Sequence, residues 1–261
     1  MEKILYPVVE KRPVYTFQNN NPAKRTKIEG HVALVNPDTG FTYGVHTDKY
    51  RLVKHEEVLE PIMEALTREG MRFMPDVTFP DNGGLMWAKL IFPDIKYEVR
   101  AKDFINPSLE IFGSYNGQWG TKMQFGAYRL VCTNGLVVGV TFDVYYRRHL
   151  TDFNADDAID MVRNVEGVFT AQTNQWKQWS DTLALPDDYE RMLNPLHLTK
   201  RDLNAIGDVV EAASGLTIDA LKLRTLDKWT LYNIVTQYLS HNLRGNLNYQ
   251  AYMFMKLRNA L

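Results

Sequence analysis

The chain of 261 residues contains a single cysteine, Cys132. One cysteine cannot form an intramolecular disulfide and leaves no cysteine-rich zinc site. The sequence also lacks an apolar run long enough to cross a bilayer, and its first residues lack the apolar core and cleavage site of a signal peptide. These absences predict a cytoplasmic protein that does not use a membrane as a partner.

The net charge of −1 lacks the basic excess of a typical duplex-DNA reader, so any nucleic-acid binding must be local. Basic residues do gather early in the chain, near its middle and late in it. They are Lys11, Arg12, Lys24, Arg25 and Lys27; Arg147 and Arg148; and Lys222, Arg224, Lys228, Arg244, Lys256 and Arg258. Taken alone, each group is more often a solvated surface than a binding site.

Motifs for catalysis or metal binding are absent as well. His55-Glu56-Glu57 lacks the second histidine of HExxH, and the glycines from Gly113 to Gly120 lack the GxxxxGK[ST] arrangement that holds nucleotide phosphates. No nucleophile, base and orienting group can be grouped from the sequence. We therefore predict no cofactor and no metal, and we favour a protein that is not an enzyme, although an enzyme with an unrecognised motif stays open.

The most informative segment is residues 121–149, where Asn134-Gly135 separates two alternating runs. This pair is the strongest short-range signal for a two-residue hairpin turn, and it predicts a long ribbon in which Lys122 faces Arg147. Alternation then gives one apolar face and one polar, basic and aromatic face that meets solvent or a ligand. The second face contains Lys122, Gln124, Gly126, Tyr128, Thr141, Asp143, Tyr145, Arg147 and His149.

Strand patterns dominate residues 1–150, with one helical pattern at residues 54–69. We predict an α+β fold whose N-terminal part is an antiparallel β-sheet with a long hairpin. Residues 151–261 are predicted to form a helical region that begins with a long helix, at residues 156–183, and packs on the first region. A heptad-like seam in that helix includes Phe169, Trp176 and Trp179, and it packs either on the sheet or on another copy of the chain.

The run YRLVCTNGL at residues 128–136, followed by Arg147-Arg148-His149, resembles the core motif of domain of unknown function 932. This family is common in phages, plasmids and bacterial genomes. Tyr50-Arg51-Leu52-Val53 and residues 229–238 resemble two further segments of the family. The resemblance implies no agreed biochemical role; its phage and plasmid context suggests DNA transactions by association, and the cytoplasm of a host cell as the location if the protein is viral.

Two functions follow from these patterns. The first is a non-enzymatic phage or mobile-element protein that binds single-stranded DNA or RNA in recombination or replication, because aromatic rings stack on unpaired bases and cations neutralise phosphates. The predicted binding residues are Lys122, Tyr128, Tyr145, Arg147, Arg148, His149, Lys256 and Arg258. The alternative is a protein-interaction module that binds a host factor or forms a homo-oligomer through Phe169, Trp176 and Trp179.

Overall fold

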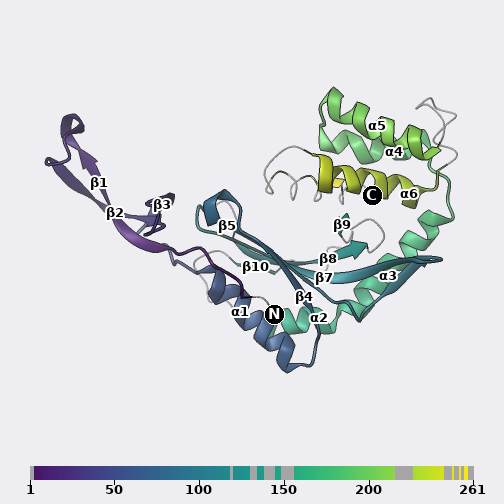
Figure 1. Ribbon diagram of the computed structural model, residues 1–261, viewed down its shortest axis with the longest axis horizontal. Helices are drawn as coiled ribbons and strands as arrows, with labels where there is room; N and C mark the ends of the chain where they lie inside the picture. Colours follow the sequence, from purple (N-terminus) through teal and green to yellow (C-terminus); the bar gives the residue numbers. More distant parts are fainter. Residues whose placement is uncertain are drawn as a thin grey trace. The chain divides into compact units, whose positions relative to one another are not determined.

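The computed structural model describes residues 3–117, 120–129, 134–137, 145–147, 156–214 and 226–243, together with residues 249, 253, 256 and 257. Over these residues, antiparallel strands occupy the N-terminal part of the chain and helices the C-terminal part, which confirms the predicted α+β class (Figure 1). None of the described helices is both long and apolar enough to span a membrane.

The chain divides into two compact units, and each unit is built from three segments. The first unit contains Met1–Leu90, Leu109–Gln124 and Asp143–Val162, and the second contains Ile91–Ser108, Phe125–Phe142 and Arg163–Leu261. The predicted division into a β-rich region, residues 1–150, and a helical region, residues 151–261, that packs on it stays a prediction.

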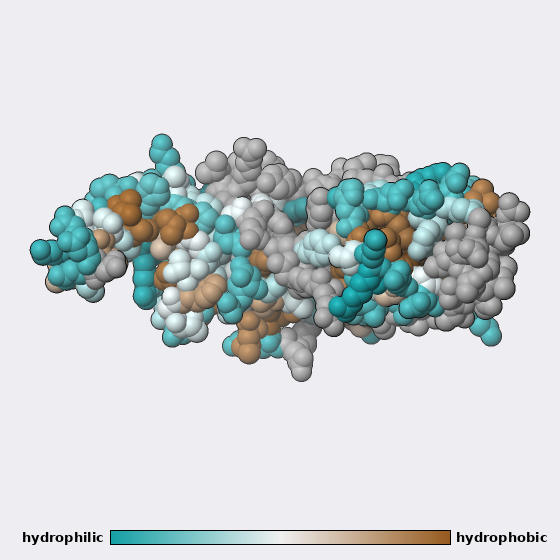
Figure 2. All heavy atoms as spheres, turned by 90° about the horizontal axis from the view of Figure 1, so that it is seen from above, coloured by the Kyte–Doolittle hydropathy of each residue, from teal (hydrophilic) through white to brown (hydrophobic). Residues whose placement is uncertain are grey.

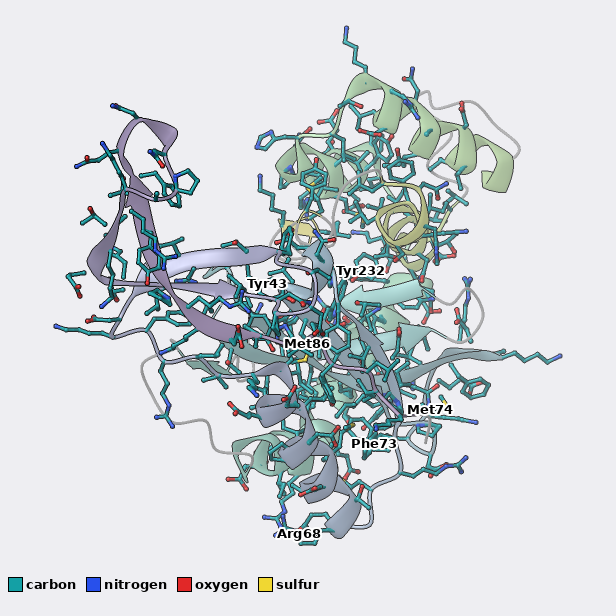
Figure 3. All side chains as sticks on the ribbon, turned by 60° about the vertical axis from the view of Figure 1, so that its left-hand side comes forward. Tyr43, Arg68, Phe73, Met74, Met86 and Tyr232 are labelled. Atoms are coloured by element: carbon teal, nitrogen blue, oxygen red, sulfur yellow. The ribbon has the colours of Figure 1, made fainter. Side chains whose placement is uncertain are left out.

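A three-stranded sheet opens the first unit, with β1 (Glu10–Phe17), β2 (Arg25–Val35) and β3 (Thr42–Thr47) in the order β1-β2-β3. The base of this sheet is apolar: Leu34 and Tyr43 are buried with Tyr115, and the rings of Tyr43 and Tyr115 lie 5.3 Å apart (Figure 3). Burial of these large side chains fixes the base of the sheet to the rest of the unit.

Beyond β3, the strands β1 and β2 continue as a two-stranded ribbon (Figure 1). Pro13 pairs with Val32, but the next pair along the ladder is Tyr15 with Lys27, so four residues of β2 stand opposite Val14. Gly30, inside this bulge, has φ of +74°, a conformation that costs glycine little and other residues more. We call residues 14–17 and 25–28 the distal ribbon.

A seven-stranded sheet is formed by β4 (Met74–Thr78), β5 (Leu85–Ile91), β6 (Tyr97–Arg100), β7 (Asp103–Ser114), β8 (Thr121–Arg129), β9 (Asn134–Val137) and β10 (Tyr145–Arg147). The order is β10-β8-β7-β5-β4, with β6 paired to β7 and β9 to β8. Helix α1 (His55–Arg68) matches the helical pattern predicted at residues 54–69. Its buried His55 stacks on Tyr115, with ring centroids 3.9 Å apart, and this contact joins the start of α1 to the end of β7.

The predicted turn at Asn134-Gly135 is wrong. Both residues lie in β9, where Asn134 pairs with Arg129 and Gly135 with Tyr128. Residues 130–133, which connect these strands, lie outside the described residues, as does Cys132. An Asn-Gly pair favours a two-residue turn, but the pairing of Arg129 with Asn134 leaves four residues between the two strands. The predicted pairing with β10 is also shifted, because Lys122 faces Tyr146 rather than Arg147.

Helices form the C-terminal part: α2 (Asp156–Arg163), α3 (Val165–Ser180), α4 (Pro186–Leu193), α5 (Lys200–Ser214) and α6 (Lys228–Gln237). The single long helix predicted at residues 156–183 is therefore interrupted at Asn164. Short turns complete the described elements: η1 (Gln18–Asn20), η2 (Asp81–Gly83), η3 (Asn194–Leu196) and the π-helical η5 (Tyr238–Asn242).

Candidate nucleic-acid interface

One face of the distal ribbon combines aromatic rings with cations. Phe17 pairs directly with Arg25, and Tyr15 pairs with Lys27. Residues that face each other across a ladder lie on the same side of the sheet, and side chains alternate along each strand. Tyr15, Phe17, Arg25 and Lys27 therefore share one face, which we call the aromatic–cation face. The opposite face carries Thr16 and Thr26.

The two rings of this face differ in how they are covered. The guanidinium carbon of Arg25 lies 4.8 Å above the centre of the Tyr15 ring, a cation–π contact. Phe17 is 49% exposed. Arg25 and Lys27 are exposed as well, and Figure 2 shows small apolar patches within a mostly hydrophilic surface at this end of the molecule. The face thus offers an exposed ring together with cations.

The charges on this face are only partly compensated. The ammonium of Lys27 lies 2.9 Å from a carboxylate oxygen of Glu29, and this hydrogen bond raises the pKa of Lys27. The Glu29 side chain is 79% exposed, so water and salt screen the pair strongly. Lys24, in the turn, is also exposed. A phosphate could therefore compete with Glu29 for Lys27 at little cost.

Backbone hydrogen bonds close the turn that joins β1 to β2. The amide of Gln18 donates to the carbonyl of Lys24 at 3.1 Å, and the amide of Lys24 donates to the carbonyl of Asn21 at 3.0 Å. The side-chain oxygen of Asn21 also accepts from the amide of Ala23. These bonds hold Phe17 and Arg25 opposite each other before any ligand binds.

Of the predicted binding residues, Lys122 on β8 is the one whose contacts define a second cationic position. It is half-buried, and its ammonium lies 5.3 Å from the centre of the Phe112 ring. Phe112 stacks on Trp87 at 5.6 Å, and the ammonium of Lys89 lies 4.5 Å from the Trp87 ring. Two lysines from different strands thus cover two adjacent rings on one face of the large sheet.

The sequence predicted that this face of β8 meets solvent or a ligand. In the structure, part of the face is buried. Gln124 is only 5% exposed, and its amide donates to a carboxylate oxygen of the buried Glu110 at 2.9 Å. Burial raises the pKa of Glu110, while Lys89 and Lys122 act in the opposite direction. The expectation is wrong at Gln124, which is buried and hydrogen-bonded to Glu110, because alternation alone does not show which polar face a fold buries.

The remaining predicted binding residues are only partly described. For Tyr128, Tyr145 and Arg147 the structure describes the backbone, within β8 and β10, while Arg148, His149 and Arg258 lie outside the described residues. Lys256 is half-buried. A shift of one residue in a strand pairing changes which residues share a face, so the observed register does not support grouping Lys122 with Tyr145 and Arg147.

The seam predicted for oligomerisation makes contacts within the second unit. Phe169 and Trp176 are at most 1% exposed. The ring of Phe169 lies 5.5 Å from that of Tyr97 on β6, and the rings of Trp176 and Trp229 lie 5.3 Å apart. Trp179 is half-buried, with its ring 5.5 Å from that of Tyr232 on α6. The first two side chains are thus enclosed by their own chain, and oligomerisation through this seam stays a prediction.

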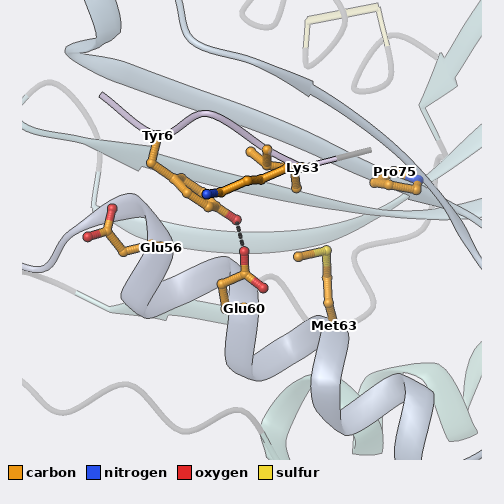
Figure 4. Close-up of a pocket in the computed structure, with 7 residues that line it drawn as sticks. Lys3, Tyr6, Glu56, Glu60, Met63 and Pro75 are labelled. Carbon is orange, nitrogen blue, oxygen red and sulfur yellow. Dashed lines mark hydrogen bonds between the residues drawn. The ribbon is translucent and has the colours of Figure 1, made fainter. Parts of the chain in front are cut away.

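A pocket of about 400 Å³ lies between the N-terminal segment and α1 (Figure 4). The hydroxyl of Tyr6 donates to a carboxylate oxygen of Glu60 at 2.8 Å, and burial followed by this hydrogen bond raises the pKa of Tyr6. Glu56 and Glu60 line the pocket together with Lys3, and two carboxylates against one ammonium disfavour a phosphate. The pocket is therefore not part of the nucleic-acid interface.

The aromatic members of the distal face were missed in the sequence, although its cations were noted. Tyr15 and Phe17 alternate on one strand, and Arg25 and Lys27 alternate on the other, so each pair carried a signal. Placing the two pairs on one face requires the strand register beyond the bulge. The sequence does not reveal that register. Among the residues that the structure describes, no group of three or more histidine, cysteine or carboxylate side chains could hold a metal ion.

Comparison with known proteins identifies one family. Residues 42–258 match the family described as Domain of unknown function (DUF932). No curated protein and no solved structure matches the chain. The matched residues begin at the start of β3, so the distal ribbon precedes them.

Proposed function

The chain belongs to the family of domain of unknown function 932, and we propose that it is a non-enzymatic phage or mobile-element protein that binds single-stranded nucleic acid. The observation that carries this proposal is the aromatic–cation face. Phe17 and Tyr15 lie on β1, and Arg25 and Lys27 lie opposite them on β2, so each ring is paired with a cation. Such a surface can stack bases and neutralise phosphates at adjacent positions.

Local charge supports this proposal better than the charge of the whole chain does. A net charge of −1 gives no long-range attraction to a polyanion. The distal ribbon and its turn instead bring Lys24, Arg25 and Lys27 within four residues, and the carboxylates that act on Lys27 are those of Glu29 and, more weakly, Asp48. Binding should therefore be local, weak at high salt and directed to this end of the first unit.

Recombination or replication is the process that we propose, since both expose single strands that a binding protein can hold. The second cationic position, at Lys89 and Lys122, supports the same ligand class. The Lys89 side chain is 24% exposed and its ammonium lies 3.8 Å from a carboxylate oxygen of Asp76, so a phosphate there would compete with that carboxylate.

The test is binding of the purified protein to fluorescent single-stranded DNA, RNA and duplex DNA across a salt series. In the variant Arg25→Ala/Lys27→Ala, we expect weaker single-strand binding and a salt slope lower by about 1.4, because each phosphate contact contributes about 0.7. The control Arg68→Ala/Arg201→Ala removes the same charge from exposed positions on α1 and α5. An unchanged slope in the first variant would contradict the proposed site, and no binding at low salt would favour the protein-interaction alternative.

A further inference from the structure

We infer that Phe17 stacks on an unpaired nucleobase and makes the distal ribbon selective for single strands over duplexes. This inference rests on the proposed function and adds the residue that sets its selectivity. It starts from the difference between the two rings of the aromatic–cation face. Arg25 already covers Tyr15, whereas Phe17 keeps 49% of its surface exposed at the end of β1.

The spacing along the strand favours an unstacked ligand. Residues two apart in a β-strand lie about 6.7 Å from each other, whereas successive nucleotides of a duplex strand rise by about 3.4 Å. Tyr15 and Phe17 are two apart on β1. Because Arg25 covers Tyr15, a base could stack only on Phe17, and a base held there cannot also stay stacked on its neighbour in the strand on that side.

The cations are placed to complete this contact. Arg25 lies directly opposite Phe17, and Lys27 lies directly opposite Tyr15. Phe17 could take one base, and the neighbouring cations Arg25 and Lys27 could contact the adjoining phosphates. In a duplex the faces of the bases are already occupied by their neighbours, so only the cations could act. Phe17 should therefore contribute to single-strand binding alone.

Exposed apolar side chains are common on protein surfaces, and the same ribbon offers an internal comparison. Ile28, which begins the bulge next to Lys27, is aliphatic and 37% exposed. If exposure alone mattered, Phe17 and Ile28 would behave alike. If stacking beside cations matters, only Phe17 will affect binding, and an aromatic substitute will preserve it.

The experiment measures the affinity of Phe17→Ala, Phe17→Leu, Phe17→Trp and the control Ile28→Ala for a single-stranded oligothymidine and for a duplex of equal length. We expect Phe17→Ala and Phe17→Leu to bind the single strand about tenfold more weakly with an unchanged salt slope, because the ring carries no charge. Phe17→Trp and Ile28→Ala should bind like the wild type, and duplex affinity should not change in any variant.

Circular dichroism and thermal unfolding of each variant check that the exposed substitutions leave the fold intact. An undiminished single-strand affinity in Phe17→Ala overturns the inference, as does an equal loss for the single strand and the duplex. In either case, continued dependence of binding on Arg25 and Lys27 would leave the proposed function standing. Failure of the wild type to bind any nucleic acid at low salt overturns both.

Discussion

The charge of the aromatic–cation face is set by a few exposed side chains, and Glu29 opposes the others. Its carboxylate lies 2.9 Å from the ammonium of Lys27. A second ion pair, between Arg12 and Glu10, lies on the other side of the bulge. Both pairs join an exposed cation to a carboxylate, but only Glu29 contacts a residue of the proposed binding face.

We therefore expect Glu29→Gln to increase single-strand affinity by about twofold to fivefold at low salt, because the variant removes one negative charge and releases Lys27. The gain should shrink as salt rises, since screening weakens both effects. Fluorescence anisotropy with a labelled oligonucleotide measures the change. Glu10→Gln, which removes the same charge beside Arg12, should have a smaller effect, and equal gains in the two variants would refute the assignment of Glu29 to this face.

Among the elements, α6 is linked to its unit through the residues at its N-terminus. Asp227 accepts a hydrogen bond from the backbone amide of Thr230 at 2.7 Å, which is a helix N-cap, and it also pairs with Arg100 of β6 at 3.2 Å. Trp229, fully buried in the first turn, donates its indole N–H to the buried Asp103 of β7 at 3.0 Å. The start of α6 is thus linked to two strands of the sheet.

Replacing Asp227 by alanine should lower the free energy of unfolding by about 1–2 kcal/mol, since it removes the cap and the link to Arg100 together. Urea denaturation followed by circular dichroism measures this loss. Asp208→Ala, at an exposed position on α5, is the control and should change stability little. A similar loss in both variants would mean that Asp227 contributes no more than an ordinary surface carboxylate.

Elements in which apolar residues recur at a regular spacing were predicted well from the sequence. Elements that depend on which strands pair, and in which register, were not. Helix α1 follows from the regular return of Val58, Ile62 and Leu66, all of which are buried. The start of β9 was misplaced because its Asn-Gly pair is a turn signal in most contexts, whereas both residues pair with β8 in the structure. The distal ribbon depends on a bulge of four residues opposite one, which no local pattern specifies. The candidate site therefore could not be assembled from the sequence, although its cations could be noted.

At the scale of the whole molecule, stability depends on a carboxyl group inside the sheet. Glu110 of β7 is buried, accepts a hydrogen bond from Gln124 and has Lys89 and Lys122 nearby. Burial favours the neutral acid and raises its pKa above the usual value of 4.5, and the two lysines only partly offset this effect. The folded protein therefore binds a proton at Glu110 more tightly than the unfolded chain does.

Because of this difference, Glu110 favours the folded state most below pH 4.5, and its contribution is lost as pH rises through the raised pKa. In Glu110→Gln the side chain is neutral at every pH and keeps an oxygen that can accept from Gln124. The free energy of unfolding of the wild type, relative to this variant, should fall between pH 4.5 and neutral pH, as measured by urea denaturation at each pH. Glu64→Gln, on the exposed side of α1, should show no such trend. A constant difference between the wild type and Glu110→Gln across this range would show that the buried carboxyl does not change its protonation on unfolding.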